Sequence, residues 1–229
     1  MDRQAPGKTG GTHDQENEKP TMRDMIRSAA GPGGMADEEE AFERDRERAW
    51  LGERLLESRS ILLAESISKD VCERITAKLL LLDRLGPKEP VNLYINSPGG
   101  DVDAGFAIFD MARFINAPVR CISAGLTASA AIIVLLAAPR ERRLSFPNAR
   151  FLMHQPSTGV RGSTSDIQIE ATEILKIRER INRLIAEETG QKVEKVEADT
   201  RRNYWINPEE AKKYGLVSRV ITKIADLGK

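Results

Sequence analysis

The regular alternation of short apolar runs with longer amphipathic segments, over residues 60–221, is the feature that most constrains the fold. Runs rich in Ile, Leu and Val predict strands at 60–66, 91–97, 118–125, 149–155 and 216–221. The segments between them predict helices at 68–85, 102–115, 164–190, 192–202 and 207–215, with a further apolar helix beginning near Ser129. Strands that alternate with helices of this length indicate an α/β domain with a covered, largely parallel sheet.

The N-terminal part of the chain has a different composition. Residues 1–36 are rich in Gly, Pro and charged side chains and poor in apolar ones, which predicts a disordered tail. Residues 37–59 predict a helical segment, because acidic side chains come first and basic ones later, as suits the helix dipole. We therefore expect one globular domain over residues 60–229.

Composition excludes several classes of function. Lys plus Arg and Asp plus Glu both number 35, so net charge gives no sign of a nucleic-acid partner. The longest apolar run, residues 128–139, is too short to span a membrane, and the N-terminus lacks the pattern of a signal peptide. Cys72 and Cys121 match no metal motif and no disulfide framework; Cys121 is expected to be a buried thiol, in a cytoplasmic protein.

Chemistry-bearing residues follow the predicted strands. The chain has two histidines; His13 lies in the tail, so imidazole acid–base work falls to His154, at the end of an apolar strand. A histidine there is also common as a hydrogen-bonded strand end. Ser129 stands between a strand and an apolar helix, where serine is either a helix N-cap or a nucleophile on a sharp turn.

The glycine-rich stretch NSPGGDVDAG, residues 96–105, joins a strand to a helix and matches no nucleotide-binding motif. It is either a simple tight turn or a source of a backbone N–H, at Gly100, for a developing negative charge. Nucleophile, base and oxyanion donor at the strand ends of one sheet indicate acyl transfer.

Several motifs in order resemble the ClpP family of ATP-dependent serine peptidases: YINSPGGDVDAGFAIFD, GLTASAAI, PNARFLMHQP, EILKIRERIN, TGQ and EEAKKYGLV. The resemblance covers about residues 53–224. It implies that Ser129 is the nucleophile, that His154 is the general base, and that Gly100 and Ala130 donate the oxyanion-hole N–H groups. The nucleophile loop reads G-L-T-A-S-A-A where the family has G-Q-A-A-S-M-G, yet Ala130 offers the same backbone N–H.

The resemblance also implies an architecture: a crotonase-like α/β fold of repeated β-β-α units, with a long handle over about residues 155–190. Family members assemble as two stacked heptamers and take unfolded proteins from hexameric AAA+ unfoldases, which dock on apolar pockets. Tyr94 and Phe114 fall where pocket residues are expected. No cofactor or metal is implied for this subunit, since ATP is used by the unfoldase.

One departure lies in DTRRNYW, residues 199–205, where the family pattern is D-T-x-R-D-x-F. Asn203 takes the place of the catalytic aspartate, Arg202 matches an arginine linked to ring contacts, and Asp199 stands about one helical turn earlier. We expect a Ser-His-Asn triad of low intrinsic activity, with Asp199 too far away to orient His154.

Three alternatives for the function remain open at this point. The chain is either an active peptidase or a mainly structural or regulatory subunit of a mixed ring with an active paralogue. Acyl-CoA chemistry, which the crotonase-like fold also hosts, is the weakest alternative, since the motifs around Ser129 and His154 favour a peptidase.

Overall fold

The computed structural model describes residues 34–156, 159 and 161–228. Two compact units, Met1–Leu51 and Gly52–Lys229, divide the chain. Helix α2, Gly34–Glu57, supplies the described residues of the first unit and crosses the boundary. Most of the predicted disordered tail lies outside the described residues, and its last three positions, 34–36, belong to α2.

The second unit is built on a sheet of seven strands. The strands are β1 (Ser60–Leu63), β2 (Val91–Ser97), β3 (Val119–Ala128), β4 (Arg143–Ser145), β5 (Arg150–Met153), β6 (Tyr204–Ile206) and β7 (Arg219–Val220). Their main order is β1-β2-β3-β4-β7, and all these pairs are parallel. The expected α/β class with a largely parallel sheet is thus confirmed.

The strand β3 pairs with two strands along one of its edges. Its first half pairs with β4 and its second half pairs with β5, both in parallel. The strand β6 then adds to β5 as the antiparallel exception. The sequence missed β4 and β6, because each has only three residues and no alternating apolar pattern.

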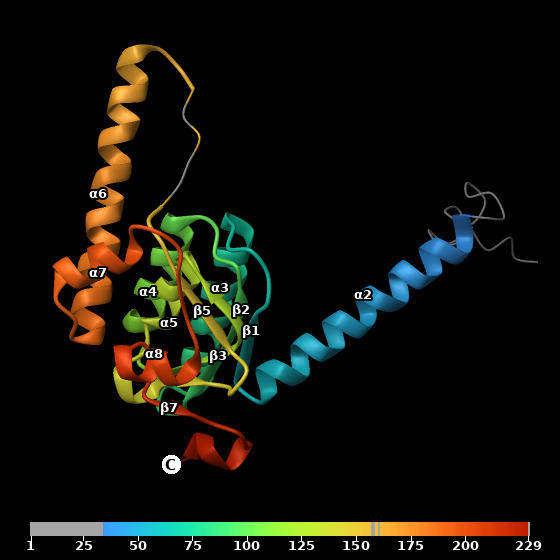
Figure 1. Ribbon diagram of the computed structural model, residues 1–229. Coiled ribbons are helices and arrows are strands. Elements are labelled where there is room, and N and C mark those ends of the chain that lie inside the picture. The colour runs from blue at the N-terminus through green and yellow to red at the C-terminus, as the bar shows by residue number, and fades with distance from the viewer. Residues whose placement is uncertain (1–33, 157–158, 160, 229) are drawn as a thin grey trace, which may run out of the picture. The chain divides into compact units, whose positions relative to one another are not determined.

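Helices cover the sheet, as Figure 1 shows. They are α3 (Lys69–Leu85), α4 (Val102–Phe114), α5 (Ala130–Leu135), α6 (Thr164–Thr189), α7 (Val193–Thr200) and α8 (Pro208–Tyr214), with short 3-10 turns at Arg140–Arg142 and Ile224–Gly228. The predicted helix at 192–202 ends at Thr200, so its last two positions were wrong. No helix in the described residues is both long enough and apolar enough to cross a membrane.

The long helix α6 is anchored at one end only. Its start is fixed by a capping box of Ser163 and Asp166, and it ends at Gly190, in the left-handed conformation that the sequence predicts for a C-cap. Residues 164–173 are exposed, whereas Asn182, Ile185, Ala186 and Thr189 are buried. The first half of α6 therefore stands clear of the sheet in Figure 1, and its base packs on the core.

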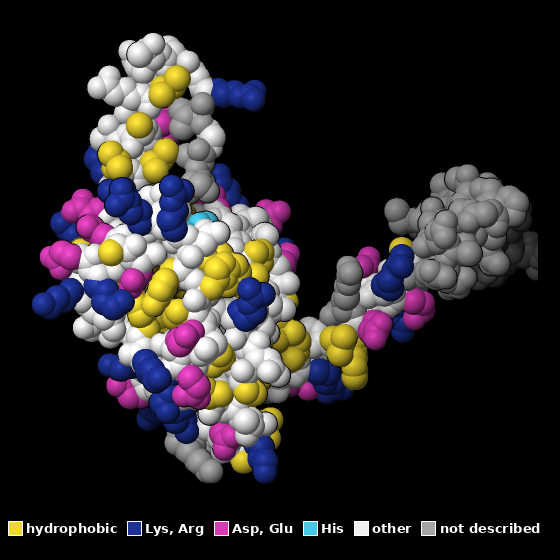
Figure 2. All heavy atoms as spheres, viewed as in Figure 1, with side chains coloured by type: hydrophobic (Ala, Val, Ile, Leu, Met, Phe, Trp, Pro, Cys, Tyr) yellow, Lys and Arg dark blue, Asp and Glu magenta, His cyan; other side chains and the backbone are white. Residues whose placement is uncertain are grey.

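Charged side chains of both signs are interspersed on the face that Figure 2 shows. This distribution agrees with the equal numbers of acidic and basic residues, 35 of each. A face without a stripe of one sign lacks the electrostatic footprint of nucleic-acid binding.

Replacing Leu93, in the middle of β2, measures how much burial in the core contributes to stability. Its side chain is fully buried, so Leu93→Ala is expected to lower the free energy of unfolding by about 2–5 kcal/mol through lost burial and a residual cavity. Leu80→Ala is the matched control, because Leu80 is 46% exposed and its loss should cost less than about 0.5 kcal/mol. Urea unfolding at one protein concentration measures both; equal midpoints would contradict the prediction.

The two cysteines give a second test. Burial raises the pKa of the Cys121 thiol to about 12, and burial followed by the charge of Asp101 raises the pKa of Cys72. A raised pKa leaves little thiolate at pH 8, so iodoacetamide should modify half-buried Cys72 slowly and Cys121 only in urea. Mass spectrometry of the alkylated protein reads out both sites, and equal modification of the two thiols in the folded protein would show the assignment to be wrong.

Candidate active site

Ser129 sits at a sharp junction between β3 and α5. Its backbone has φ 55° and ψ −124°, a conformation that serine rarely adopts and that costs about 1–3 kcal/mol. Its side chain makes no capping hydrogen bond to α5, although serine is a frequent N-cap. The hydroxyl is therefore presented by the turn rather than used to start the helix.

Backbone hydrogen bonds hold this turn on both sides. The N–H of Ser129 donates to the carbonyl of Leu152 on β5 at 2.9 Å, and its own carbonyl accepts from Ile132 of α5 at 2.9 Å. The loop before it is tied to β2, since the N–H of Leu126 donates to Oδ1 of Asn96 at 2.9 Å. Three elements thus fix the position of Ser129.

Gly99 packs directly against the serine turn. Its φ is +90°, and an added Cβ would lie 2.5 Å from the carbonyl oxygen of Ala128 and 2.7 Å from Cβ of Ser129. Only glycine allows the glycine-rich turn and the serine turn to approach so closely. The sequence pattern pointed to Gly100 and missed Gly99; the first glycine of the SPGG stretch was the available signal.

Gly100 contacts a different segment, the residue Ile67 that follows β1. It forms a parallel bridge with Ile67, in which the N–H of Ile67 bonds to Gly99 and the N–H of Asp101 bonds to Ile67. In a parallel bridge the residue between those two neighbours directs its own N–H away from the partner. The N–H of Gly100 is therefore not used in its bridge with Ile67.

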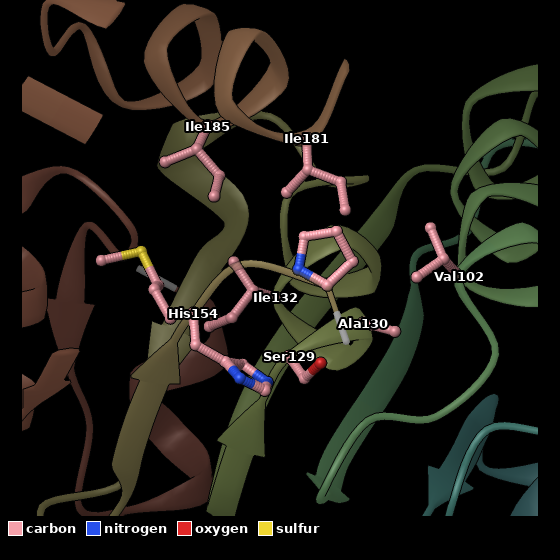
Figure 3. Close-up of a pocket in the computed structure, with 9 residues that line it drawn as sticks. Val102, Ser129, Ala130, Ile132, His154, Ile181 and Ile185 are labelled. Atoms are coloured by element: carbon pink, nitrogen blue, oxygen red, sulfur yellow. The ribbon is translucent and has the colours of Figure 1, made fainter. Parts of the chain in front are cut away.

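A small cavity joins the serine to the histidine (Figure 3). Ser129 and His154 lie next to each other at its floor, and Ile181 and Ile185 of α6 lie above them. Its full lining is apolar apart from these two residues and comprises Val102, Ser129, Ala130, Ile132, Met153, His154, Pro156, Ile181 and Ile185. The structure therefore brings together Ser129, His154 and Ala130, which the sequence placed in one site.

Asn203 lies near His154 in the strand topology. Phe151 pairs with Ile206 and Met153 with Tyr204 in the antiparallel β5–β6 ladder. His154 directly follows β5 and Asn203 directly precedes β6, so both residues adjoin the same end of this ladder.

The carboxylate of Asp199 forms hydrogen bonds with Lys195 and Tyr214. Its Oδ2 accepts from Nζ of Lys195 at 2.6 Å and from the hydroxyl of Tyr214 at 2.9 Å. Burial, and then the hydrogen bond to Asp199, raise the pKa of the Tyr214 hydroxyl. Asp199 also belongs to α7, which ends at Thr200, whereas Asn203 lies between α7 and β6, so the two residues do not belong to one helix.

Ser129 and His154 line one cavity, and Asn203 is exposed and is not part of its lining. In the described part of the chain, no hydrogen bond links Ser129 to His154 or His154 to Asn203. Catalytic hydrogen bonds often tighten only when substrate binds. His13 lies outside the described residues.

Metal ligation finds no support in the described residues, where no group of three His, Cys, Asp or Glu side chains is placed to hold a metal ion.

A strained serine, a neighbouring histidine and a glycine turn at the strand ends of an α/β sheet define the class of serine hydrolases. The chain belongs to the Clp protease family, whose model, described as Clp protease, matches residues 43–224. It is a proteolytic subunit of the ATP-dependent Clp protease type, with the ClpP fold and serine peptidase chemistry.

Similar proteins agree with this assignment. The ATP-dependent Clp protease proteolytic subunit 2 of Treponema denticola is 50% identical over 177 residues, which are 77% of this chain and 88% of that protein. Proteolytic subunit 3 of Rhizobium etli is 49% identical over 173 residues, covering 76% and 89%. An asparagine-to-aspartate mutant of ClpP1 from Listeria monocytogenes has a similar solved structure, with a TM-score of 0.72, 42% identity, and coverage of 77% of this chain and 99% of that one.

Gly99→Ala tests the close approach of the two turns. The added methyl group meets backbone atoms of Ala128 and the Cβ of Ser129, so the reaction of Ser129 with a fluorophosphonate should slow by about 100-fold or more. Gly52→Ala is the control, because its Cβ would meet no atom within 4 Å and its φ needs no glycine. Equal labelling rates in the two variants would contradict a role for Gly99 in placing the serine.

Proposed function

We propose that this subunit cleaves unfolded polypeptides with a Ser-His-Asn triad of Ser129, His154 and Asn203. The observation that carries the proposal is the geometry at β5. This strand bonds to the backbone of Ser129, is followed directly by His154, and pairs with β6, which begins one residue after Asn203.

In the proposed reaction, Oγ of Ser129 attacks the carbonyl carbon of the scissile peptide while an imidazole nitrogen of His154 takes its proton. The C–N bond then breaks as His154 returns that proton to the leaving amine. Water, deprotonated by the same imidazole, cleaves the Ser129 ester and releases the peptide acid. One base thus serves both halves of the reaction.

The oxyanion formed in each half would accept hydrogen bonds from the N–H groups of Gly100 and Ala130. The N–H of Ala130 starts α5, where backbone donors lack partners within the helix. The N–H of Gly100 is not used in its bridge with Ile67, which supports its role as the second donor. Such donors, fixed before the reaction, are worth several kcal/mol each in a dry site.

Asn203 explains why we expect low intrinsic activity. Its side-chain oxygen can accept the ring N–H of His154 and fix the tautomer, but a neutral amide does not offset the charge of the imidazolium. In a Ser-His-Asp peptidase the change from aspartate to asparagine lowers kcat by about 10⁴-fold. That factor corresponds to about 5.4 kcal/mol.

Assembly as stacked heptamers is supported by the exposed part of α6. Ile167, Ile169 and Leu175 are 45%, 60% and 54% exposed on a half-helix that stands clear of its own sheet. Apolar side chains in that position suit contact with a second ring. Arg202, two residues past α7 and exposed, is placed for ring contacts.

A Clp-type AAA+ unfoldase is the proposed partner, in the cytoplasm, and ATP is used by that partner. Phe114 is 79% exposed at the end of α4. Tyr94 is half-buried on β2, beside Leu62 of β1, which is 48% exposed. These exposed apolar side chains support docking of an apolar loop, and the role fits protein quality control.

A structural or regulatory role in a mixed ring is the second candidate. Asn203 itself favours it, because a subunit with weak chemistry can still contribute walls and docking surfaces to a ring with an active paralogue. The unused hydroxyl and strained backbone of Ser129 favour the peptidase.

Asn203→Asp is expected to raise peptide turnover by about tenfold or more, because a carboxylate stabilises the imidazolium of His154. Ser129→Ala should abolish both turnover and fluorophosphonate labelling. Peptide hydrolysis and labelling of the purified protein, with and without an unfoldase, provide the measurements.

Asp199→Asn is the matched control, since its carboxylate contacts Lys195 and Tyr214 rather than the histidine. It should leave the labelling rate of Ser129 within a few-fold of wild type. An unchanged rate in Asn203→Asp would show that the third position does not limit turnover, and absence of labelling in the wild type under every condition would leave the structural role.

A further inference from the structure

A charge network lies at the base of α6; the side chains of Arg143 and Glu188 are 2% and 17% exposed, and that of Arg113 is 41% exposed. The carboxylate of Glu188 accepts from Nη2 of Arg113 at 2.5 Å and from Nη2 of Arg143 at 2.9 Å. We call these three residues the Glu188 clamp. They come from α4, β4 and the last turn of α6, so the clamp joins three elements.

Arg143 is the most enclosed member. Its side chain is 2% exposed, and its Nη2 also donates to the backbone carbonyl of Glu188 at 3.0 Å. Its Nε and Nη1 have no hydrogen-bond partner in the described residues. Glu188 is therefore the anion that accompanies this buried cation, and a buried charge needs such a partner.

Arg113 extends the clamp to the helix that begins beside the nucleophile. Its Nε donates to the carbonyl of Ala137 at 3.2 Å, and its Nη2 donates to the carbonyl of Leu136 at 3.1 Å. These carbonyls follow directly on α5, whose first residue is Ala130. The guanidinium also stacks on the ring of Phe109, 4.3 Å from its centre.

The two arginines would repel each other without the carboxylate between them. Burial lowers the pKa of Arg143, the charge of Arg113 lowers it further, and the charge of Glu188 opposes both. Glu188 thus holds together two cations that belong to different layers of the domain.

Glu188 shares a helix face with two residues of α6 that line the cavity. Ile181, Ile185 and Glu188 are spaced by four and three residues on α6, which places them on one face of the helix. The two isoleucines line the cavity over Ser129 and His154. Glu188 therefore acts on two walls of the site: the roof from α6, and the short helix α5 behind the nucleophile.

We propose that Glu188 is a positioning residue for Ser129, because its contacts with Arg113 and Arg143 fix α5 and the base of α6 relative to each other. This proposal rests on the proposed peptidase function. It assigns Glu188 no contact with substrate. Small displacements of a nucleophile are sufficient to slow a reaction by 10²-fold.

The first test replaces the carboxylate by an amide of the same shape. Glu188→Gln should slow labelling of Ser129 by a fluorophosphonate by about 10- to 100-fold and lower kcat similarly, with little change in KM. Hydrogen exchange of the α5 amides, such as Ile132, should become faster. A role in global stability alone would instead lower the unfolding midpoint and leave the labelling rate of folded protein unchanged.

Glu179→Gln is the matched control. Glu179 pairs with Arg183 on the same helix at 2.6 Å, but both side chains are more than half exposed. Such a pair contributes little, so labelling and exchange should stay as in the wild type. If Glu188→Gln fails to fold, the double variant Arg143→Met with Glu188→Gln removes the unpaired buried cation as well, and the same slow labelling and fast exchange are expected from it.

A folded Glu188→Gln or double variant that labels Ser129 and exchanges its α5 amides at wild-type rates would overturn the proposal. The peptidase function fails separately, if wild-type Ser129 is never labelled. In that case the exchange measurement alone decides: faster exchange of α5 in Glu188→Gln supports the clamp, and unchanged exchange overturns it.

Discussion

The backbone of Ser129 is held in a conformation that a free chain avoids, and the rest of the site is arranged around that turn. A cost of about 1–3 kcal/mol persists only where the surroundings leave no alternative. Here the carbonyl of Leu152 fixes the N–H of Ser129, Gly99 closes the space beside it, and the fully buried helix α5 follows at once. The strain is therefore opposed by packing in three directions.

The charged groups of the domain lie outside the apolar cavity that holds Ser129. The cavity itself is lined mostly by aliphatic side chains, while the nearest buried ion pairs lie at the base of α6. An apolar lining keeps water away from an oxyanion and strengthens the backbone donors that face it. The fold thus separates the groups that react from the groups that hold helices together.

Most of the fold and part of the site were predictable from the sequence, for identifiable reasons. Apolar periodicity predicted β2, α3 and α6, because long elements repeat their pattern several times. Strand ends predicted Ser129 and His154. The three-residue strand β6 was not predictable, because its pairing with β5 depends on a contact between distant parts of the chain. Gly99 and Glu188 were missed for the same reason, since their partners are 29 or more residues away in sequence.

The strand β5 links the residues of the proposed triad through main-chain atoms: Leu152 accepts from the N–H of Ser129, His154 directly follows the strand, and Met153 pairs with the residue after Asn203. Asparagine and aspartate differ at position 203 by an amide nitrogen in place of an oxygen. Under the proposed triad, a lineage of such subunits can raise or lower its chemical output by a single exchange of that kind, while the sheet that carries the site stays the same.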